Sequence, residues 1–198
     1  MWKVLFILAL SVVLVSCEED EGGSVTDFNE QEILDMRAAK DEEFRSNSAS
    51  PIPEGKRATF NGLRYFDPDP DFVVEATFAP STTRDTVVMQ TSSKEPRIAI
   101  RAGTFTFSLR NSKHKLVAYT FVGNEGTSFF VPFTDKTTGH ETYYSGRYLD
   151  ITKVDGNDYV IDFNEAYNPY CAYNDRYSCP LVPSENDLSI AIRAGEKK

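Results

Sequence analysis

The segment 163–195 constrains the fold of this chain more than any other stretch. It combines four tyrosines, three prolines and two cysteines, namely Tyr167, Tyr170, Tyr173, Tyr177, Pro169, Pro180, Pro183, Cys171 and Cys179. Because each proline removes a backbone donor and restricts the residue before it, neither a plain helix nor a plain strand can run through this segment. We therefore expect a folded, cross-braced loop that closes a domain.

The chain from residue 67 onward alternates between apolar and polar residues with a period of two, most clearly at 104–109 and 159–163. This period is typical of half-buried strands. The expected strands are 72–79, 86–91, 98–100, 104–109, 115–122, 128–133, 143–151, 159–163 and 188–193. Since no helical pattern separates them and turn residues do, we expect a mainly β fold, an antiparallel barrel or sandwich.

One N-terminal amphipathic helix is expected at residues 27–45, with Asp27 and Glu30 placed as a capping box. The two faces would be formed by Ile33, Met36, Ala39 and Phe44 on the apolar side and by Lys40, Asp41 and Glu42 on the polar side. Because the polar face carries many acids, packing on the domain is favoured over a membrane surface. The helix and its connector would cover 27–53, and the all-β domain 54–198.

Residues 1–16 have the pattern of a signal peptide. A short positive start precedes twelve apolar residues at 4–15, a run that is short for a helix crossing roughly 30 Å of hydrocarbon. Residues 14–17, Leu-Val-Ser-Cys, resemble the bacterial lipobox, whose family is cut before a cysteine that receives the lipid on its sulfur. We expect lipidation at Cys17, with an ordinary secretory signal and a transmembrane anchor as the alternatives.

Residues 17–26 follow as an acidic, glycine-containing tether. The acids directly after Cys17 also resemble the export tag of some surface lipoproteins of Gram-negative bacteria. The expected partner is therefore the membrane, reached through the lipid at Cys17. The expected location is the cell envelope, on the outer membrane if the cell is Gram-negative, with the face left open.

The formal net charge of −9 repels phosphates, which excludes a nucleic acid partner from the expectations. About 170 residues after the tether suffice for one domain with its own core. The sequence has no glycine-rich phosphate loop after a strand and no Gly-x-Ser-x-Gly motif. We therefore predict no cofactor and no catalytic residue from motifs.

Cys171 and Cys179 are the only other cysteines beside Cys17. In an oxidising compartment they favour a disulfide, worth roughly 2.5 kcal/mol for so short a loop. A closed zinc site wants four ligands, and only His114 and His140 remain as further candidates, so no metal is expected. A cysteine nucleophile paired with His140 is equally disfavoured.

Four stretches of the chain strongly resemble an uncharacterised bacterial and archaeal family, the domain of unknown function 1684. They are 37–53, 62–70, 133–151 and the tail YNPYCAYNDRYSCPLVPSENDL at 167–188, which is followed by IRAGE. The resemblance covers roughly residues 35–196 and implies a fold and a boundary, but no reaction. Separately, the hexapeptide IAIRAG occurs at both 98–103 and 190–195, which we interpret as two strand ends with similar needs.

Nine polar residues in these stretches form the candidate ligand-binding set: Asp135, Glu141, Arg147, Tyr148, Asp150, Asn164, Asn168, Glu185 and Asn186. Gathered in one cleft, they would suit a sugar or peptide, or an acid and base pair for glycoside hydrolysis. Alternatively, Arg147 pairs with Glu141 or Glu185 to hold the tail, and the asparagines satisfy turns. The expected function is a binding or structural module for an unknown ligand or envelope protein; the alternative is a glycosidase-like hydrolase with paired carboxylates.

Overall fold

The computed structural model describes residues 28–123 and 126–198. The predicted signal peptide, Cys17 and the tether lie outside these residues. The longer elements are α1 Glu30–Ser46, α2 Glu54–Arg57, β1 Val73–Pro80, β2 Thr86–Met89, β3 Arg97–Leu109, β4 Ser112–Phe121, β5 Ser128–Phe133, β6 Arg147–Thr152 and β7 Asp158–Asp162. Single 3-10 turns are η1 Pro70–Phe72, η2 Phe163–Glu165, η3 Tyr170–Ala172 and η4 Ser184–Asn186. No helix in the described part has the length and hydropathy of a membrane span.

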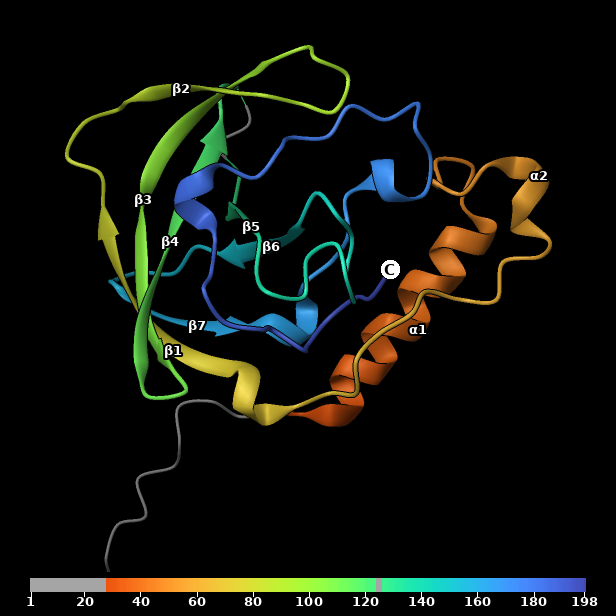
Figure 1. The fold of residues 1–198 in the computed structure, drawn as a ribbon, viewed down its shortest axis with the longest axis horizontal. Helices are drawn as coiled ribbons and strands as arrows, with labels where there is room; N and C mark the ends of the chain where they lie inside the picture. The colour runs from red at the N-terminus through yellow and green to blue at the C-terminus, as the bar shows by residue number, and fades with distance from the viewer. Residues whose placement is uncertain (1–27, 124–125) are drawn as a thin grey trace, which may run out of the picture.

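The strands form one antiparallel sheet in the order β6-β5-β4-β3-β1-β7, and β2 adds to β3 beside this path. Figure 1 shows the sheet curving around the C-terminal tail as a half-barrel. The prediction of a mainly β, antiparallel fold with one longer helix near the N-terminus is confirmed. The described strands make a single open sheet, with β6 and β7 at its two ends, instead of a closed barrel or a two-sheet sandwich.

Two of the expected strands, 98–100 and 104–109, are one continuous strand, β3. Its pairing with β4 shifts register between Arg101 and Gly103, which allows the long strand to bend. A Cβ at Gly103 would lie 2.5 Å from the Ala79 carbonyl oxygen, so the close approach of β1 requires glycine there.

The expected strand at 188–193, which holds the second IAIRAG, is wrong. Its backbone bonds to loops instead of to a neighbouring strand, with Leu188 N donating to Thr134 O at 2.8 Å and Lys136 N to Ile190 O at 2.9 Å. The strand expected at 143–151 begins only at Arg147, because three successive amides from 140 to 142 donate to Thr137 O and wind the chain into turns. Local alternation is therefore overridden by bonds to distant loops.

The core is built from the alternate positions of the strands. The ring centroid of Phe78 in β1 lies 4.7 Å from that of Phe105 and 4.6 Å from that of Phe129. Tyr159 of β7 packs edge-on against Phe105. The tail contributes buried side chains to the same cluster, among them Ile192. The tail thus closes the half-barrel as part of its core.

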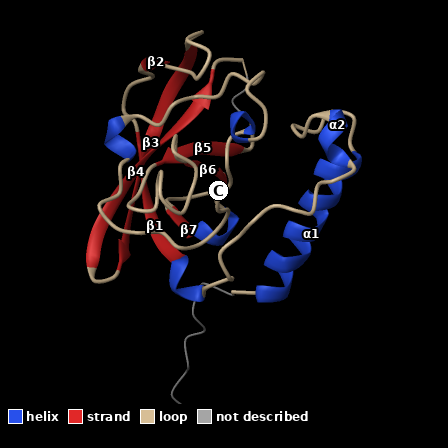
Figure 2. Cartoon of the chain, turned by 45° about the vertical axis from the view of Figure 1, so that its right-hand side comes forward, coloured by secondary structure: helices blue, strands red, loops and turns tan. Residues whose placement is uncertain are grey.

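Helix α1 stands apart from the sheet, with loops of the chain between them (Figure 2). Its cap is Asn29, whose side chain accepts from Glu32 N at 3.3 Å, whereas the expected cap Asp27 lies outside the described residues. The buried face consists of Ile33, Arg37 and Phe44.

The expected faces of α1 are wrong at four positions, because two of its polar side chains have partners on the domain. Met36 and Ala39, assigned to the apolar face, are exposed. Lys40 and Asp41, assigned to the wet face, point to the domain, where Lys40 pairs with Glu196 and Asp41 accepts from Leu63 N at 2.9 Å.

Candidate functional site

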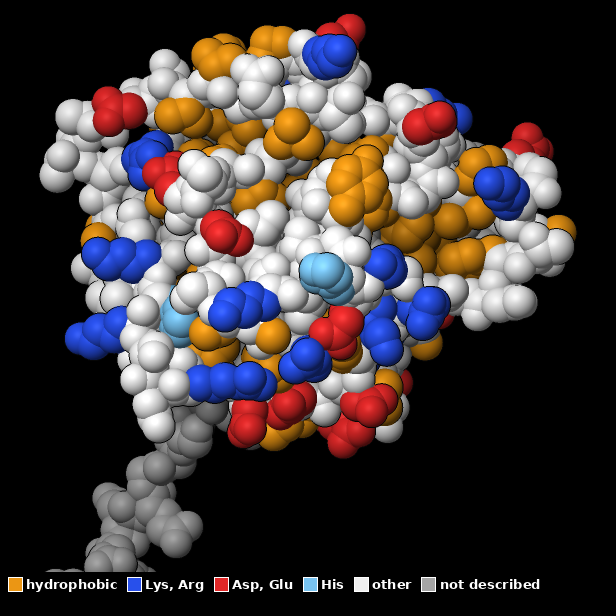
Figure 3. All heavy atoms as spheres, in the orientation of Figure 1, with side chains coloured by type: hydrophobic (Ala, Val, Ile, Leu, Met, Phe, Trp, Pro, Cys, Tyr) orange, Lys and Arg blue, Asp and Glu red, His pale blue; other side chains and the backbone are white. Residues whose placement is uncertain are grey.

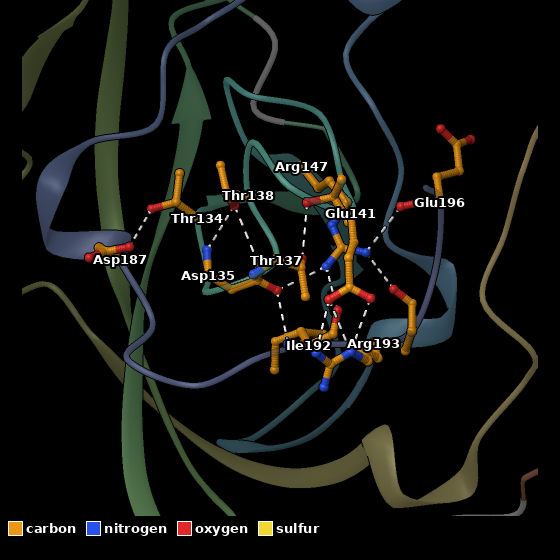
Figure 4. A network of polar contacts seen from close by, with 12 residues as sticks. Thr134, Asp135, Thr137, Thr138, Glu141, Arg147, Asp187, Ile192, Arg193 and Glu196 are labelled. Carbon is orange, nitrogen blue, oxygen red and sulfur yellow. Dashed lines mark hydrogen bonds and ion pairs between the residues drawn. The ribbon is translucent and has the colours of Figure 1, made fainter. Parts of the chain in front are cut away.

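The centre of the predicted site is Arg147, the first residue of β6, which is 1% exposed. Its guanidinium donates to the backbone oxygens of Ile192 at 2.8 Å, Glu196 at 3.2 Å and Ala194, as Figure 4 shows. The Arg147 side chain therefore satisfies backbone oxygens at the end of the tail that a neighbouring strand would satisfy in a sheet.

The carboxylate beside Arg147 belongs to Asp135, at 3.0 Å between Nη2 and Oδ2. Asp135 also accepts from the backbone amides of Thr137 at 2.8 Å and Ile192 at 3.0 Å. Burial lowers the pKa of Arg147, and the charge of Asp135 opposes that effect. The expected pairing of Arg147 with Glu141 or Glu185 is wrong, because this buried carboxylate takes its place.

Glu141 and Glu185 pair with the two arginines of the repeated hexapeptide. Arg193 Nη2 lies 2.9 Å from Glu141, and Arg101 Nη2 lies 2.6 Å from Glu185, which also accepts from the Tyr119 hydroxyl. Arg193 lowers the pKa of Glu141. For Glu185, burial raises the pKa, but the bonds from Arg101 and Tyr119 bring it below its usual value. Both carboxylates are ionised at neutral pH and tie loops to the domain.

The three asparagines of the set bond to backbone. Asn186 fills the gap where β4 and β5 diverge, accepting from Val117 N at 2.7 Å and donating to Val117 O at 2.9 Å and Pro132 O at 2.7 Å. Asn164 exchanges two bonds with the backbone of Asp69, at 2.9 Å each. Asn168 donates through Nδ2 to Lys197 O at 2.9 Å. All three are buried and fix the loops that close the sheet.

Tyr148 and Asp150 of β6 meet Tyr167 of the tail. Tyr148 and Tyr167 exchange backbone bonds of 2.9 and 3.0 Å, and the Tyr167 hydroxyl donates to Asp150 at 2.7 Å. The Tyr148 hydroxyl donates to Pro180 O. Of the nine-residue set, Tyr148 and Asp150 also line a groove on the surface of the domain.

This groove, which we call the tyrosine groove, has a volume of about 640 Å³ and lies between α1, the β4–β6 strands and the tail. Its aromatic lining is Phe44, Phe121, Phe130, Tyr148, Tyr167, Tyr170 and Tyr177. Its charged side chains are Lys40, Glu43, Arg97 and Asp150. Hydrophobic side chains also gather between the body of the domain and the α1–α2 lobe in Figure 3. A groove with aromatic walls and a few charged groups is typical of small-molecule sites.

Sequence reasoning missed Glu196, which is fully buried. Its carboxylate receives Lys40 Nζ at 2.5 Å, the Asn168 amide at 2.8 Å and the Tyr173 hydroxyl. No local sequence pattern predicts that Glu196 is buried and paired, because its partner Lys40 lies 156 positions earlier in the chain. Glu196 is thus the point where α1 and the tail are joined.

Cys171 and Cys179 are free thiols in the structure, so the expected disulfide is not present in it. They are neighbours, since Cys171 N donates to Cys179 Sγ at 3.2 Å. The hydrogen bond from Cys179 lowers the pKa of Cys171 to about 6, and the same contact with burial raises the pKa of Cys179. Cys179 also lines the tyrosine groove.

A second pair of carboxylates, outside the predicted set, borders a longer cleft of about 1550 Å³ between α1 and the sheet. Burial raises the pKa of Asp162, which accepts from Asn164 N at 2.7 Å. Burial and then the charge of Asp162 raise the pKa of Glu165. No group of three or more His, Cys, Asp or Glu side chains fit to hold a metal occurs in residues 28–123 and 126–198.

These features define a class of protein, a small half-barrel domain that is closed by its own polar-pinned tail and bordered by an aromatic groove. The chain belongs to the family described as protein of unknown function (DUF1684), whose model matches residues 58–197. Among solved structures it is similar to the uncharacterized protein from gene locus rrnAC0354 of Haloarcula marismortui, with 40% identity, 85% of this chain and 94% of that chain covered, and a TM-score of 0.68. No curated protein matches the chain significantly.

Proposed function

We propose that this protein is a lipid-anchored binding module of the cell envelope, tethered through Cys17, which takes its ligand in the tyrosine groove. The observation that carries the proposal is the lining of that groove, where seven aromatic rings stand beside four charged side chains. Aromatic faces supply large contact areas at little entropic cost, and the charged groups orient what they bind. Tyr148 and Asp150 would contact the ligand.

The other seven residues of the candidate set would act as supports. Each of them makes at least one hydrogen bond to backbone or to an opposite charge, as with Asp135 and Arg147. A rigid frame of this kind keeps the groove in its binding shape, which lowers the entropic cost of binding.

The test is binding to the full chain in detergent, scanned by thermal shift against envelope sugars, peptidoglycan fragments and peptides. A ligand that binds only the folded state raises the melting temperature. Tyr170→Ala, at the 41% exposed rim of the groove, should reduce the shift, whereas Tyr144→Ala, 72% exposed and outside the groove, should not. Equal ligand-induced shifts in melting temperature for both variants would mean that the ligand binds elsewhere, and would reject the groove as the binding site.

The anchor has its own test. Changing Cys17 to Ala removes the sulfur that would carry the lipid, so the protein should move from the membrane fraction to the soluble fraction. Unchanged fractionation contradicts the anchor but leaves the groove untouched.

The hydrolase alternative is favoured by one observation, the paired carboxyl groups of Asp162 and Glu165, both with raised pKa values at the edge of the long cleft. Glycoside hydrolysis uses an acid with a raised pKa beside a second carboxyl group. Glu165→Gln should abolish release of sugar from envelope polysaccharide; activity that survives this change rejects the assignment.

A further inference from the structure

Strands β6 and β7 follow each other in the chain but do not pair. The turn between them, 153–157, has only five residues, yet β6 and β7 are the two ends of the sheet. Consecutive strands joined by a short turn usually lie side by side. Here both strands line the long cleft of about 1550 Å³, with residues 149–152 of β6 and 158–160 of β7. The sheet is therefore open where these two strands would otherwise meet.

The register shows which backbone groups of β7 face away from β1. Phe78 N donates to Asn157 O at 2.7 Å, in register with the ladder between β1 and β7. Bonded and non-bonded pairs alternate along an antiparallel ladder, so Tyr159 and Ile161 bond to β1. The N–H and C=O groups of Val160 then point outward, and no other described segment pairs with this edge.

The edge of β6 is unpaired in the same way. Tyr148 exchanges both of its backbone bonds with Tyr167, so its N–H and C=O groups face away from β5. By alternation, those of Asp150 and Thr152 also face away from β5. Within residues 28–123 and 126–198 this edge has no strand partner after Tyr167. Two unpaired strand edges thus border one cleft, an arrangement that suits an added strand.

The cleft is acidic. It is lined by one lysine, Lys113, and by six carboxylates: Glu32, Glu75, Asp150, Asp158, Asp162 and Glu165. None of the six forms an ion pair with another residue of the described chain. Partial desolvation and then the charges of Asp162 and Glu32 raise the pKa of Glu165, as expected where negative charges lie together. A strand that brings cations is therefore favoured.

Charge disfavours two other strands as occupants of the cleft. A second copy of this chain would bring its own acidic edge and a net charge of −9. The segment 17–26 of the chain itself carries four acids and no base. Since like charges across an interface cost binding free energy, a cationic segment of another protein fits best.

The outer face of β7 determines the pattern of side chains that would suit it. Asp158, Val160 and Asp162 alternate with the buried Tyr159 and Ile161, so the first three share one face of the sheet. Val160 is 39% exposed between the two carboxylates. Neighbours on adjacent strands stabilise a sheet when apolar side chains or opposite charges meet.

We propose that the long cleft binds an extended peptide, which adds as a strand to the edge of β7 and carries a cation, an apolar residue and a cation at alternate positions. The apolar residue lies opposite Val160, and the cations face Asp158 and Asp162. This inference goes beyond the proposed function and does not depend on the tyrosine groove.

The experiment measures binding of acetyl-Thr-Lys-Thr-Val-Thr-Lys-Thr-amide to the full chain in detergent by calorimetry. The same peptide with glutamate for lysine should bind at least about tenfold more weakly, because it brings like charges. Methylation of the valine nitrogen keeps the charge but removes the donor to Val160 O, so it should weaken binding at least about fivefold. Asp158→Asn should weaken binding about threefold. Glu54→Gln, an exposed acid of α2 outside the cleft, is the control and should not change it.

Amide exchange locates the bound peptide. The Val160 amide should exchange at least about tenfold more slowly when the peptide is bound. Val88 of β2 is the matched control, since it is 61% exposed and lies outside the cleft. Its amide also points away from the neighbouring strand, because Arg101 N donates to Asp85 O and fixes the alternation there. Exchange at Val88 should not change.

The outcomes decide between strand addition and plain attraction of charge. If the methylated peptide binds as tightly as the parent and exchange at Val160 is unchanged, the cleft attracts cations without adding a strand, and the inference is overturned. Equal binding of the glutamate peptide, or no binding at millimolar concentration, also overturns it. The tyrosine groove is tested with other ligands and with Tyr170→Ala, so that proposal stands or falls separately.

Discussion

Asp135 and Arg147 form an ion pair of 3.0 Å in which the side chains are 0% and 1% exposed. The pair connects the turn after β5 with the first residue of β6, and both partners also bond to Ile192 of the tail. A single buried contact thus joins the sheet edge to the segment that closes it.

Asp135→Asn is expected to destabilise the protein by about 3–5 kcal/mol, because it leaves the Arg147 charge buried without its counterion. Urea denaturation of both proteins measures this loss. Asp155→Asn, on an exposed turn, is the control and should stay within about 0.5 kcal/mol. A loss below about 1 kcal/mol for Asp135→Asn would mean that water reaches the pair.

Asn186→Ala should cost about 2–4 kcal/mol, since it leaves backbone groups of Val117 and Pro132 unpaired in the core. Hydrogen exchange gives a local readout, because the Val117 amide loses its acceptor and should exchange faster than its neighbours in β4. Asn61→Ala changes an exposed asparagine and serves as the control. Unchanged protection of Val117 would contradict the bridging role.

Glu185→Gln should lose stability only above the acid range. The folded-state pKa of Glu185 lies below the usual pKa of a glutamate. The stability that its carboxylate contributes is therefore present above that usual pKa and disappears as pH falls through the lower folded pKa. The pair with Arg101 is partly exposed, so the loss at pH 7 should not exceed about 1 kcal/mol. Denaturation at pH 7 and pH 3 should show the difference at pH 7 alone.

Glu165→Gln should have the opposite sign. Glu165 is exposed at the edge of the long cleft, but partial desolvation and the charge of Asp162 raise its pKa in the folded state, so its ionised form is slightly disfavoured there once pH rises above the unfolded pKa. The variant should therefore be more stable than the native protein at pH 7 and equal to it at pH 3. Destabilisation at pH 7 would show that the carboxylate has a structural partner.

Cys171 should be the more reactive thiol. With a pKa of about 6 it is largely thiolate at neutral pH, whereas the pKa of Cys179 is raised. Iodoacetamide should label Cys171 with a midpoint near pH 6, and mild oxidation should join the two cysteines and add roughly 2.5 kcal/mol of stability. Equal labelling rates, or no disulfide under oxidation, would contradict the structure around this pair.

Strand positions could be predicted from the sequence wherever alternation coincided with turn residues. The expected strands at 72–79 and 128–133 match β1 and β5 closely, because their apolar positions fall on one face of the sheet. The segment 188–193 has the same alternation but no strand partner, because the Arg147 side chain and the loop after β5 take its backbone groups. Alternation of apolar and polar residues shows that one face of a segment is buried. Whether the segment becomes a strand depends on whether a neighbouring strand is there to pair with its backbone.

The sequence picked out nine polar residues but not the partners that the structure gives them, and only Tyr148 and Asp150 of the nine line the tyrosine groove. Arg147, Asn164, Asn168 and Asn186 are all buried and all bonded to backbone, which agrees with the structural alternative stated for the asparagines. The burial of Glu196 and Arg37 was not predicted, since a charged residue in a helix or at a chain end is usually exposed to solvent. Their burial depends on surfaces that come together only when α1 docks on the tail.

The sequence by itself determined the class of fold, the turns and the tail that cannot be a regular element, because proline, glycine and the period of two act over a few neighbouring residues. Tertiary structure alone decided which charges pair, that the sheet stays open, and that the tyrosine groove lies between α1 and the tail. Lys40 and Glu196 meet across 156 positions of sequence. No short-range pattern encodes such a contact, because it depends on the packing of the whole chain.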